Sequence, residues 1–248
     1  CNSINMKLDK VFFSENIKTL FYALIIAIII RSLFIQPFYI PSSSMEPTLL
    51  VGDRLFVTKY SYGYSKHSFP FSPPILNKRI FFSKPERGDV IVFKTPTDNR
   101  TDYIKRVIGL PNDKIQIVNG QIIINDKLII RKKTDDFLDV DSKGNINKNR
   151  QYKEYFYQLE INVLDLKDNG IVDNTQVFNV PKGHFFVMGD NRDNSQDSRF
   201  ISYVGFIPIK NLVGKAQFIF FSLENSRFLE IWKWPKAIRF DRIFEIIK

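Results

Sequence analysis

Residues 115–124 read IQIVNGQIII, and this stretch indicates most directly how the chain folds. Its two β-branched runs, Ile115–Val118 and Gln121–Ile124, favour strands, and the Asn-Gly pair between them favours a two-residue hairpin turn. Further short runs of this kind, bounded by turn residues, are Val90–Phe93, Val177–Val180 and Phe185–Met188. Helical periodicity is rare between residues 40 and 225, so the sequence predicts a chain that is mostly β.

Two segments between these runs have no regular pattern. Tyr64–Ser83 is rich in proline and aperiodic, which predicts an extended loop. Lys132–Lys153 is polar and charged, and it is predicted to be a surface insertion that separates an earlier β unit from a later one.

Composition excludes some kinds of site. The chain has 248 residues, with 36 Lys and Arg against 26 Asp and Glu, and a net charge of +10. A basic balance suits nucleic acid or an anionic membrane surface equally well. The single cysteine excludes an intramolecular disulfide, and having only two histidines argues against a classical zinc site. Catalysis would therefore depend on hydroxyls, carboxylates and lysines, or on a borrowed cofactor.

An apolar segment near the N-terminus has the composition of a membrane anchor. Thr19–Ile30 carries no charge, and the apolar character resumes beyond Arg31. If Arg31 snorkels, residues 19–35 reach roughly 25 Å as a helix, near the lower limit for spanning a bilayer. A core helix would have a polar face, and a cleavable signal peptide would end in small residues; neither feature is present. We therefore expect an uncleaved anchor.

Basic residues set the expected orientation of this anchor. They precede the apolar segment and are Lys7, Lys10 and Lys18. The positive-inside rule then places the N-terminal flank in the cytoplasm and the rest of the chain on the other side.

Three short segments carry candidate chemistry. They read PSSSMEPTL at 41–49, DYIKRVIGLP at 102–111 and MGDNRDNSQDSR at 188–199. Alone, each has an ordinary explanation: a proline-bounded turn, a strand with a solvated lysine, and a polar loop. Strand alternation puts Tyr103, Lys105 and Val107 on one face of the strand and Ile104 and Arg106 on the other. The third segment is rich in oxygen ligands, but an EF-hand starting at Asp193 would lack both the required glycine and the final glutamate.

Taken together, in this order and behind one anchor, the three segments resemble the motifs of the bacterial type I signal peptidases, membrane-bound serine/lysine proteases. The flanking runs RGDVIVFK at 87–94 and NLVGKA at 211–216 extend the resemblance over most of residues 34–220. Ser43 stands where the family commonly has glycine, and the family pattern places the nucleophile immediately before methionine, which is Ser44 here. Residues 125–180 have no matching motif.

The resemblance implies a role for each site residue. Ser44 would attack the scissile carbonyl, and Lys105 would serve as general base and then as general acid. Lowering the pKa of Lys105 to about 8 costs roughly 3 kcal/mol of ammonium stabilisation. Its apolar neighbours Tyr103, Ile104 and Val107 could supply this desolvation. The Ser44 N–H and the Ser42 hydroxyl would bind the oxyanion, Ser195 would orient the Lys105 amine, and Asp197 and Arg199 would form a structural ion pair. No cofactor and no metal are expected.

The resemblance also implies the substrate. Family members cleave secretory precursors that carry signal peptides, after small side chains at the first and third positions before the cut. The matching pocket residues are Phe38, Ile40, Pro41, Met45, Val92, Tyr103 and Ile104. The substrate is expected to bind as an added strand.

The implied fold is mostly β, with an antiparallel catalytic core and an inserted smaller β-rich domain on one N-terminal transmembrane helix. The expected divisions are a cytoplasmic flank at 1–18, an anchor at 19–35, a catalytic core at 36–113 and 185–225, an insertion at 114–184, and a basic aromatic segment at 226–248. The expected partners are signal-peptide-bearing secretory preproteins and membrane lipid, and the expected location is the bacterial cytoplasmic (inner) membrane, with the catalytic part on its outer, periplasmic side. Dispersed charge on an exported domain argues against a nucleic-acid partner.

Other functions stay open at this point. A self-cleaving Ser/Lys repressor has a related fold but would need a DNA-binding domain. A serine protease could use His67 or His184 as its base, and the chain could also be an inactive membrane-tethered binding module. In the C-terminal segment, Phe240, Ile243, Phe244 and Ile247 have the spacing of one helix stripe, which could pack on the core or lie on a membrane surface.

Overall fold

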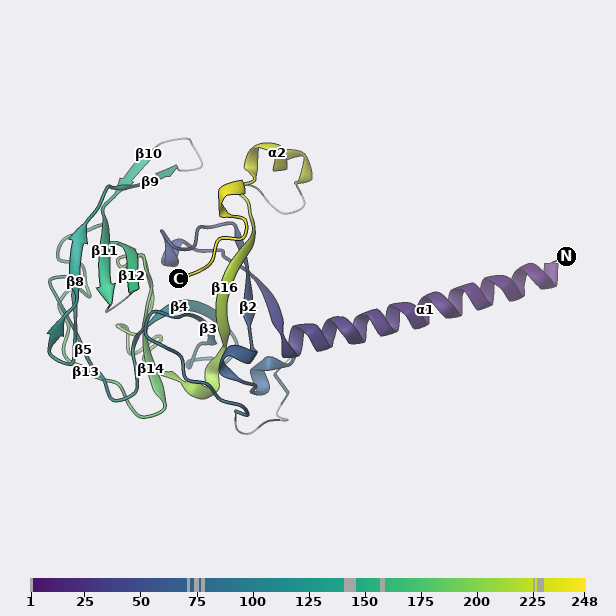
Figure 1. The fold of residues 1–248 in the computed structure, drawn as a ribbon, viewed down its shortest axis with the longest axis horizontal. Coiled ribbons are helices and arrows are strands. Elements are labelled where there is room, and N and C mark those ends of the chain that lie inside the picture. The colour runs from purple at the N-terminus through teal and green to yellow at the C-terminus, as the bar shows by residue number, and fades with distance from the viewer. Residues whose placement is uncertain are drawn as a thin grey trace.

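A seven-stranded antiparallel sheet forms the body of the protein, in the order β1-β2-β16-β3-β4-β14-β15 (Figure 1). The computed structural model describes residues 2–70, 72–73, 76, 79–140, 146–156, 159–224, 226 and 230–248, with the side chains of 2–14 and 140 left out. The strands of this sheet are β1 Ile35–Tyr39, β2 Asp53–Thr58, β3 Val90–Lys94, β4 Asp102–Gly109, β14 His184–Met188, β15 Ile207–Pro208 and β16 Leu212–Ser222.

Three smaller sheets come from the residues between β4 and β14. They contain β5 Lys114–Val118, β6 Gln121–Ile124, β7 Lys127–Leu128 and β13 Phe178–Asn179; β8 Ile130–Lys133, β11 Gln151–Phe156 and β12 Leu159–Leu164; and β9 Phe137–Val140 with β10 Ile146–Asn149. The predicted hairpin is confirmed, because Val118 pairs with Gln121 across the turn. Asn119 and Gly120 both have positive φ, at 49° and 72°, as a primed hairpin turn requires.

The polar segment Lys132–Lys153 is more regular than its composition suggests. It contains β9 and β10 and the ends of β8 and β11. These strands are exposed on at least one face, so polar residues satisfy their outer positions and the hydrophobic alternation that signals a strand is weak. The loop predicted over Tyr64–Ser83 is mostly irregular where it is described, apart from the short 3-10 turn Lys66–Ser68.

The smaller sheets share a hydrophobic core with the large one. One buried cluster joins Ile115 and Ile122 of the hairpin to Ile108 of β4 and Phe186 of β14. Two further clusters lie on opposite faces of the large sheet, and β4 alternates between them: Tyr103 and Val107 pack in one and Ile104 in the other, as predicted. We propose that residues 114–184 are an insertion in the sequence of the large sheet that packs as part of the same body.

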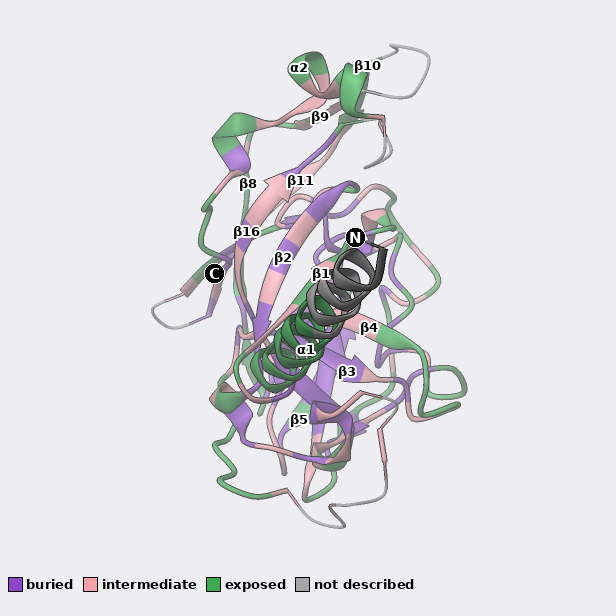
Figure 2. Cartoon of the chain, turned by 90° about the vertical axis from the view of Figure 1, so that its right-hand side faces the viewer, coloured by how far each residue is buried: buried purple, intermediate pink, exposed green. Residues whose placement is uncertain are grey.

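Helix α1, Asn2–Leu33, leaves the body as a long exposed rod, and Figure 2 shows its exposed surface along the described part. Its segment Glu15–Leu33 is long and apolar enough to cross a membrane by length and composition. Its 19 residues correspond to about 28 Å. The helix ends at Leu33 and the chain enters β1 at Ile35, slightly earlier than the expected anchor boundary.

The helix predicted from the stripe at 240–247 is wrong. The segment has α2 at Trp234–Ala237 and a 3-10 turn at Phe240–Arg242, and then runs extended along β16. Ile246 bridges to Phe218, and Ile247 is buried among core residues of the sheet. Pairing with β16 satisfies backbone groups that a helix would have satisfied internally, so a tertiary contact overrides the local spacing.

Candidate active site

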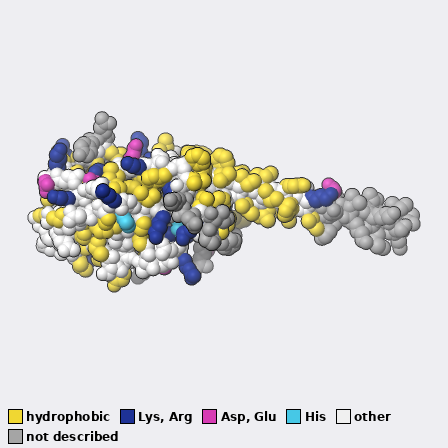
Figure 3. Space-filling model, turned by 90° about the horizontal axis from the view of Figure 1, so that it is seen from below, with side chains coloured by type: hydrophobic (Ala, Val, Ile, Leu, Met, Phe, Trp, Pro, Cys, Tyr) yellow, Lys and Arg dark blue, Asp and Glu magenta, His cyan; other side chains and the backbone are white. Residues whose placement is uncertain are grey.

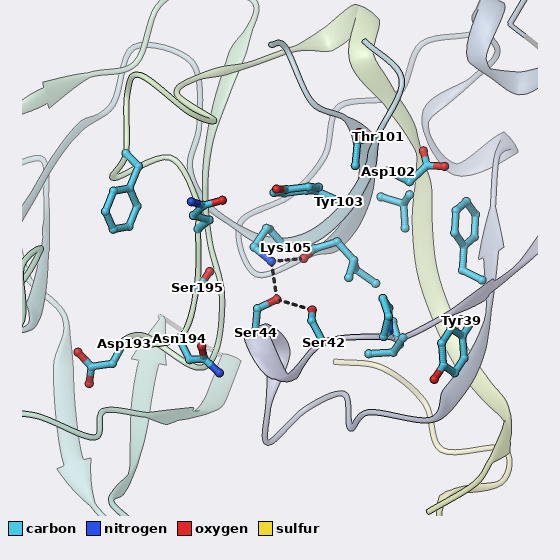
Figure 4. A pocket seen from close by; sticks show the side chains of 17 residues that line it. Tyr39, Ser42, Ser44, Thr101, Asp102, Tyr103, Lys105, Asp193, Asn194 and Ser195 are labelled. Atoms are coloured by element: carbon cyan, nitrogen blue, oxygen red, sulfur yellow. Dashed lines mark hydrogen bonds between the residues drawn. The ribbon is translucent and has the colours of Figure 1, made fainter. Parts of the chain in front are cut away.

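The first and second motifs meet at a serine–lysine pair. The Lys105 Nζ lies 2.7 Å from the Ser44 Oγ and 2.9 Å from the carbonyl oxygen of Ile104 (Figure 4). The Ser42 hydroxyl lies 3.4 Å from the Ser44 Oγ. Both members of the pair are largely buried, with Ser44 9% and Lys105 4% exposed.

Secondary structure positions both side chains. Lys105 stands in β4, opposite Ile91 of β3, so its backbone is held inside the sheet. Ser44 lies in the 3-10 turn Ser43–Met45, in the loop that joins the edge strand β1 to β2. The fully buried Met45 pins this turn to the core, which leaves Ser44 facing Lys105.

The environment of Lys105 favours its neutral form. Burial lowers the pKa of the Lys105 amine to about 8, although the carboxylates of Asp197 and Asp190 oppose the shift. A neutral amine carries a lone pair and can take a proton from a hydroxyl at hydrogen-bonding distance. At a pKa of 8, about one molecule in ten is neutral at pH 7, which is far more than for an ordinary lysine.

The third motif wraps around the serine turn. The Asn191 N–H donates to the Ser44 carbonyl at 3.2 Å, and the Asn194 amide donates to the Ser43 hydroxyl at 2.6 Å. Gly189 permits this approach: a Cβ there would lie 2.4 Å from the Ser44 carbonyl oxygen, so any side chain would push the turn away.

Asp197 and Arg199 form the expected ion pair. The Arg199 Nε donates to Asp197 Oδ1 at 2.8 Å, and its Nη2 donates to Oδ2 at 2.8 Å. Burial alone would raise the pKa of Asp197, but Arg199 and the Gly189 N–H hold it below its usual value. The Asp197 carboxylate is therefore ionised. The pair holds the loop through its other bonds, because Asp197 accepts from the Gly189 N–H and the Arg199 Nη2 donates to the Arg192 carbonyl at 2.6 Å.

A second buried pair was missed by the sequence reasoning. Arg106 contacts Asp190 through Nε at 2.8 Å and Nη2 at 2.6 Å, and the Thr48 hydroxyl donates to the same carboxylate at 2.6 Å. This network joins all three motifs behind the site. Arg106 belongs to the second motif and Asp190 to the third. Strand alternation predicts only that the Arg106 side chain lies on the opposite face of the strand from Lys105, and it does not predict which residue Arg106 contacts.

Ser195 lies beside the serine–lysine pair without bonding to the amine. Its hydroxyl is buried and makes no hydrogen bond to Lys105, but it lies close enough to the Asp197 carboxylate to help lower the pKa of that group, and Figure 4 shows it near Lys105 with no bond drawn. In this structure the partners of the amine are Ser44 and the Ile104 carbonyl. The orienting role expected for Ser195 stays a prediction.

A cavity of about 660 Å³ opens in front of the pair. Of the seven expected substrate contacts, six line it: Phe38, Ile40, Pro41, Val92, Tyr103 and Ile104. Met45 does not, because its side chain is 0% exposed and packs in the core. The resemblance assigned no role to the other described lining residues, which are Tyr39, Thr101, Asp102, Asp193, Asn194, Gln196 and Phe200. Neither His67 nor His184 is among the described lining residues.

Comparison with known proteins assigns the family. The family described as "Signal peptidase, peptidase S26" matches residues 13–221. Signal peptidase I of Rickettsia typhi is 40% identical over 242 residues, which cover 90% of each chain. Signal peptidase I of Rickettsia canadensis is 39% identical over 246 residues, covering 92% of this chain and 91% of the relative. A crystal structure of a signal peptidase I from Enterococcus faecalis V583 aligns at 28% identity with a TM-score of 0.32, covering 54% of this chain and 97% of that one.

The match places the chain among the peptidases. More particularly, it belongs to the signal peptidase family, peptidase S26, as the order of its motifs indicates.

Proposed function

We propose that this protein removes N-terminal signal peptides from secreted precursor proteins by means of a serine nucleophile and a lysine general base. The observation that carries the proposal is the 2.7 Å contact between Lys105 Nζ and Ser44 Oγ in a buried site. Its substrates are then preproteins, and it needs neither a histidine nor a cofactor for the hydrolysis.

In the proposed reaction, neutral Lys105 takes the Ser44 proton as the serine oxygen attacks the carbonyl carbon of the scissile bond. The resulting oxyanion accepts hydrogen bonds from the Ser44 N–H and the Ser42 hydroxyl. Protonated Lys105 then donates to the leaving amine, which is the new N-terminus of the mature protein. Water attacks the acyl-enzyme with Lys105 again as base, which releases the signal peptide and restores Ser44.

The cavity supports the proposed choice of small side chains. Residues of β1 and of β4 line it together, and β1 is an edge strand of the large sheet. An extended peptide can pair with such an edge and place alternate side chains in the cavity. The large side chains of Phe38 and Tyr103, both among the expected contacts, line this cavity and limit the space for the substrate side chains before the cut.

The pH dependence of cleavage tests the lysine base. Because Lys105 must be neutral and the pKa of its amine is about 8, kcat/KM is expected to rise with pH and level off above about 8. The measurement is the rate of precursor cleavage by the detergent-solubilised protein between about pH 5 and 10. This range extends below the ordinary pKa of histidine and above the pKa of Lys105, so it separates the two possible bases. A profile already flat above the ordinary pKa of histidine contradicts a lysine base.

We further propose that the chain resides in the bacterial inner membrane, with the N-terminal flank in the cytoplasm and the body outside. The exposed apolar surface of Glu15–Leu33, visible in Figure 3 as the band along α1, would contact lipid. Large apolar side chains of the C-terminal segment are exposed too, Trp232 at 72% and Phe244 at 74%, and could lie at the same membrane surface.

Cysteine labelling tests this orientation. Cys1 is the only cysteine in the chain, so a membrane-impermeant maleimide reports on the N-terminal flank. In intact spheroplasts we expect Cys1 to be protected, whereas Asp168→Cys in a Cys1→Ser background should react fully. Lysis should expose both. Labelling of Cys1 in intact spheroplasts would reverse the proposed orientation.

A further inference from the structure

Three carboxylates from separate segments converge beside the candidate active site. They belong to Asp165 after β12, Asp173 before β13 and Asp193 of the third motif. One oxygen from each lies within 4.8 Å of the others. Asp165 and Asp173 are buried, so solvent does little to screen their mutual repulsion.

Hydrogen bonds hold these carboxylates in place but leave oxygens available. Asp193 Oδ2 accepts from the Leu166 and Lys167 N–H groups, and Asp173 Oδ2 accepts from the Gly170 N–H. Asp165 Oδ2 accepts from Arg131, whereas its Oδ1 is buried without any partner among the described residues. The Asp165 side chain is only 9% exposed, so this oxygen is a buried acceptor that a ligand within the cluster would satisfy.

Close backbone packing keeps the cluster compact. A Cβ on Gly170 would lie 2.7 Å from Asp193 Oδ1 and 3.2 Å from Asp173 Oδ1, so the glycine allows both oxygens to approach the loop. The hairpin turn closes another side, where a Cβ on Gly120 would lie 3.0 Å from Asp165 Oδ2.

The charges do not balance within the protein. Arg131 compensates one of the three carboxylates. Arg150 donates to the Asp165 backbone carbonyl, but its ion pair is with the exposed Asp168. Counted by formal charge, three carboxylates against one guanidinium leave a surplus of two negative charges, which matches the charge of a divalent cation.

We propose that Asp165, Asp173 and Asp193 form a binding site for a divalent cation, and that calcium suits it best. Calcium takes oxygen ligands at about 2.3–2.6 Å, so ligands on opposite sides can be about 5 Å apart, and it accepts irregular geometry. Magnesium demands a near-ideal octahedron with ligands at about 2.0–2.1 Å. The three carboxylates come from irregular parts of the chain and offer oxygens that lie within 4.8 Å of one another, an arrangement that calcium tolerates better. Water would complete the shell.

Such a site would connect the insertion to the active-site loop. Asp193 lines the candidate active-site cavity next to Asn194, as Figure 4 shows, while Asp165 and Asp173 belong to the insertion. The cation would hold the start of the Asp193–Arg199 loop against the smaller sheets. This arrangement differs from an EF-hand, in which one loop supplies the ligands: Asp165 and Asp173 flank one connection of the insertion, and Asp193 belongs to the third motif.

Calorimetry and thermal unfolding of the detergent-solubilised full chain test this site. After treatment with EDTA and dialysis, titration with calcium chloride should give one site per chain, with a Kd on the order of 10⁻⁴ to 10⁻³ M and weaker binding of magnesium. Calcium at about ten times its Kd should raise the melting temperature by about 3–6 °C. An absence of saturable calcium binding by the parent protein overturns the proposal, whatever any variant does.

Asp173→Asn separates a cation site from a merely structural cluster. The amide keeps the acceptor for the Gly170 N–H but removes one repelling charge, so the variant should melt at or above the parent in EDTA and lose the calcium shift. Asp168→Asn is the matched control, because it removes a carboxylate from the same loop outside the cluster, and it should keep the full shift. A calcium shift that persists in Asp173→Asn contradicts the assignment, as does a shift lost equally in the control.

Discussion

Replacing Lys105 by arginine is expected to abolish precursor cleavage, with kcat/KM reduced by at least about 10³-fold. A guanidinium does not lose its proton at working pH, so it cannot accept the Ser44 proton even if it occupies the same position. Lys105→Ala and Ser44→Ala should be equally inactive, because each removes one member of a pair that works as a unit.

Ser43→Ala is the matched control for this experiment. Its hydroxyl accepts from the Asn194 amide and lies next to Ser44 in the same turn, but Lys105 hydrogen-bonds Ser44. Most activity should therefore remain. The measurement is kcat/KM on one small-residue precursor, together with the melting temperature of each variant to show that it is folded. Substantial cleavage by folded Lys105→Arg would exclude lysine as the base, and loss of activity in Ser43→Ala alone would reopen the choice of serine.

Asp197→Ala is expected to destabilise the protein by about 3–5 kcal/mol, because it strands the buried charge of its partner. Arg199 is 2% exposed at its side chain and would keep only its bond to the Arg192 carbonyl. The Gly189 N–H would also lose its acceptor. The melting temperature should fall on the order of 10 °C, and Arg199→Ala should behave in the same way.

Two further variants sharpen this test. Asp168→Ala breaks an exposed ion pair, with Asp168 83% exposed, and should change the stability by less than about 1 kcal/mol. Ser195→Ala should nearly keep its melting temperature, because removing this hydroxyl costs only about 1 kcal/mol, yet lose about 10- to 100-fold in turnover if the hydroxyl orients Lys105 during the reaction. If Asp197→Ala melts like the parent but is inactive, Asp197 belongs to the catalytic machinery.

Local patterns were sufficient for the elements that form locally. The hairpin at 118–121 depends on two adjacent turn residues, and the strands beside it depend on short β-branched runs. Polar strands such as β9 and β10 escaped this reasoning because their side chains do not have to alternate when little of either face is buried. The spacing of apolar residues at 240–247 gave a wrong prediction of a helix. Such spacing does not show whether the backbone pairs with a strand, as Ile246 does with Phe218 of β16.

Composition, short sequence patterns and the order of three motifs were enough to predict the β character of the chain, the apolar N-terminal helix and the two residues proposed for catalysis. The sequence did not predict that Ser44 and Lys105, 61 residues apart, lie 2.7 Å from each other, that Met45 packs in the core, or that Asp193 lies close to Asp165 and Asp173; these are properties of the folded chain. The physical reason is range. Turn chemistry and strand period act between neighbours, whereas the contacts between motifs depend on sheet register and on glycines such as Gly189 that permit close packing.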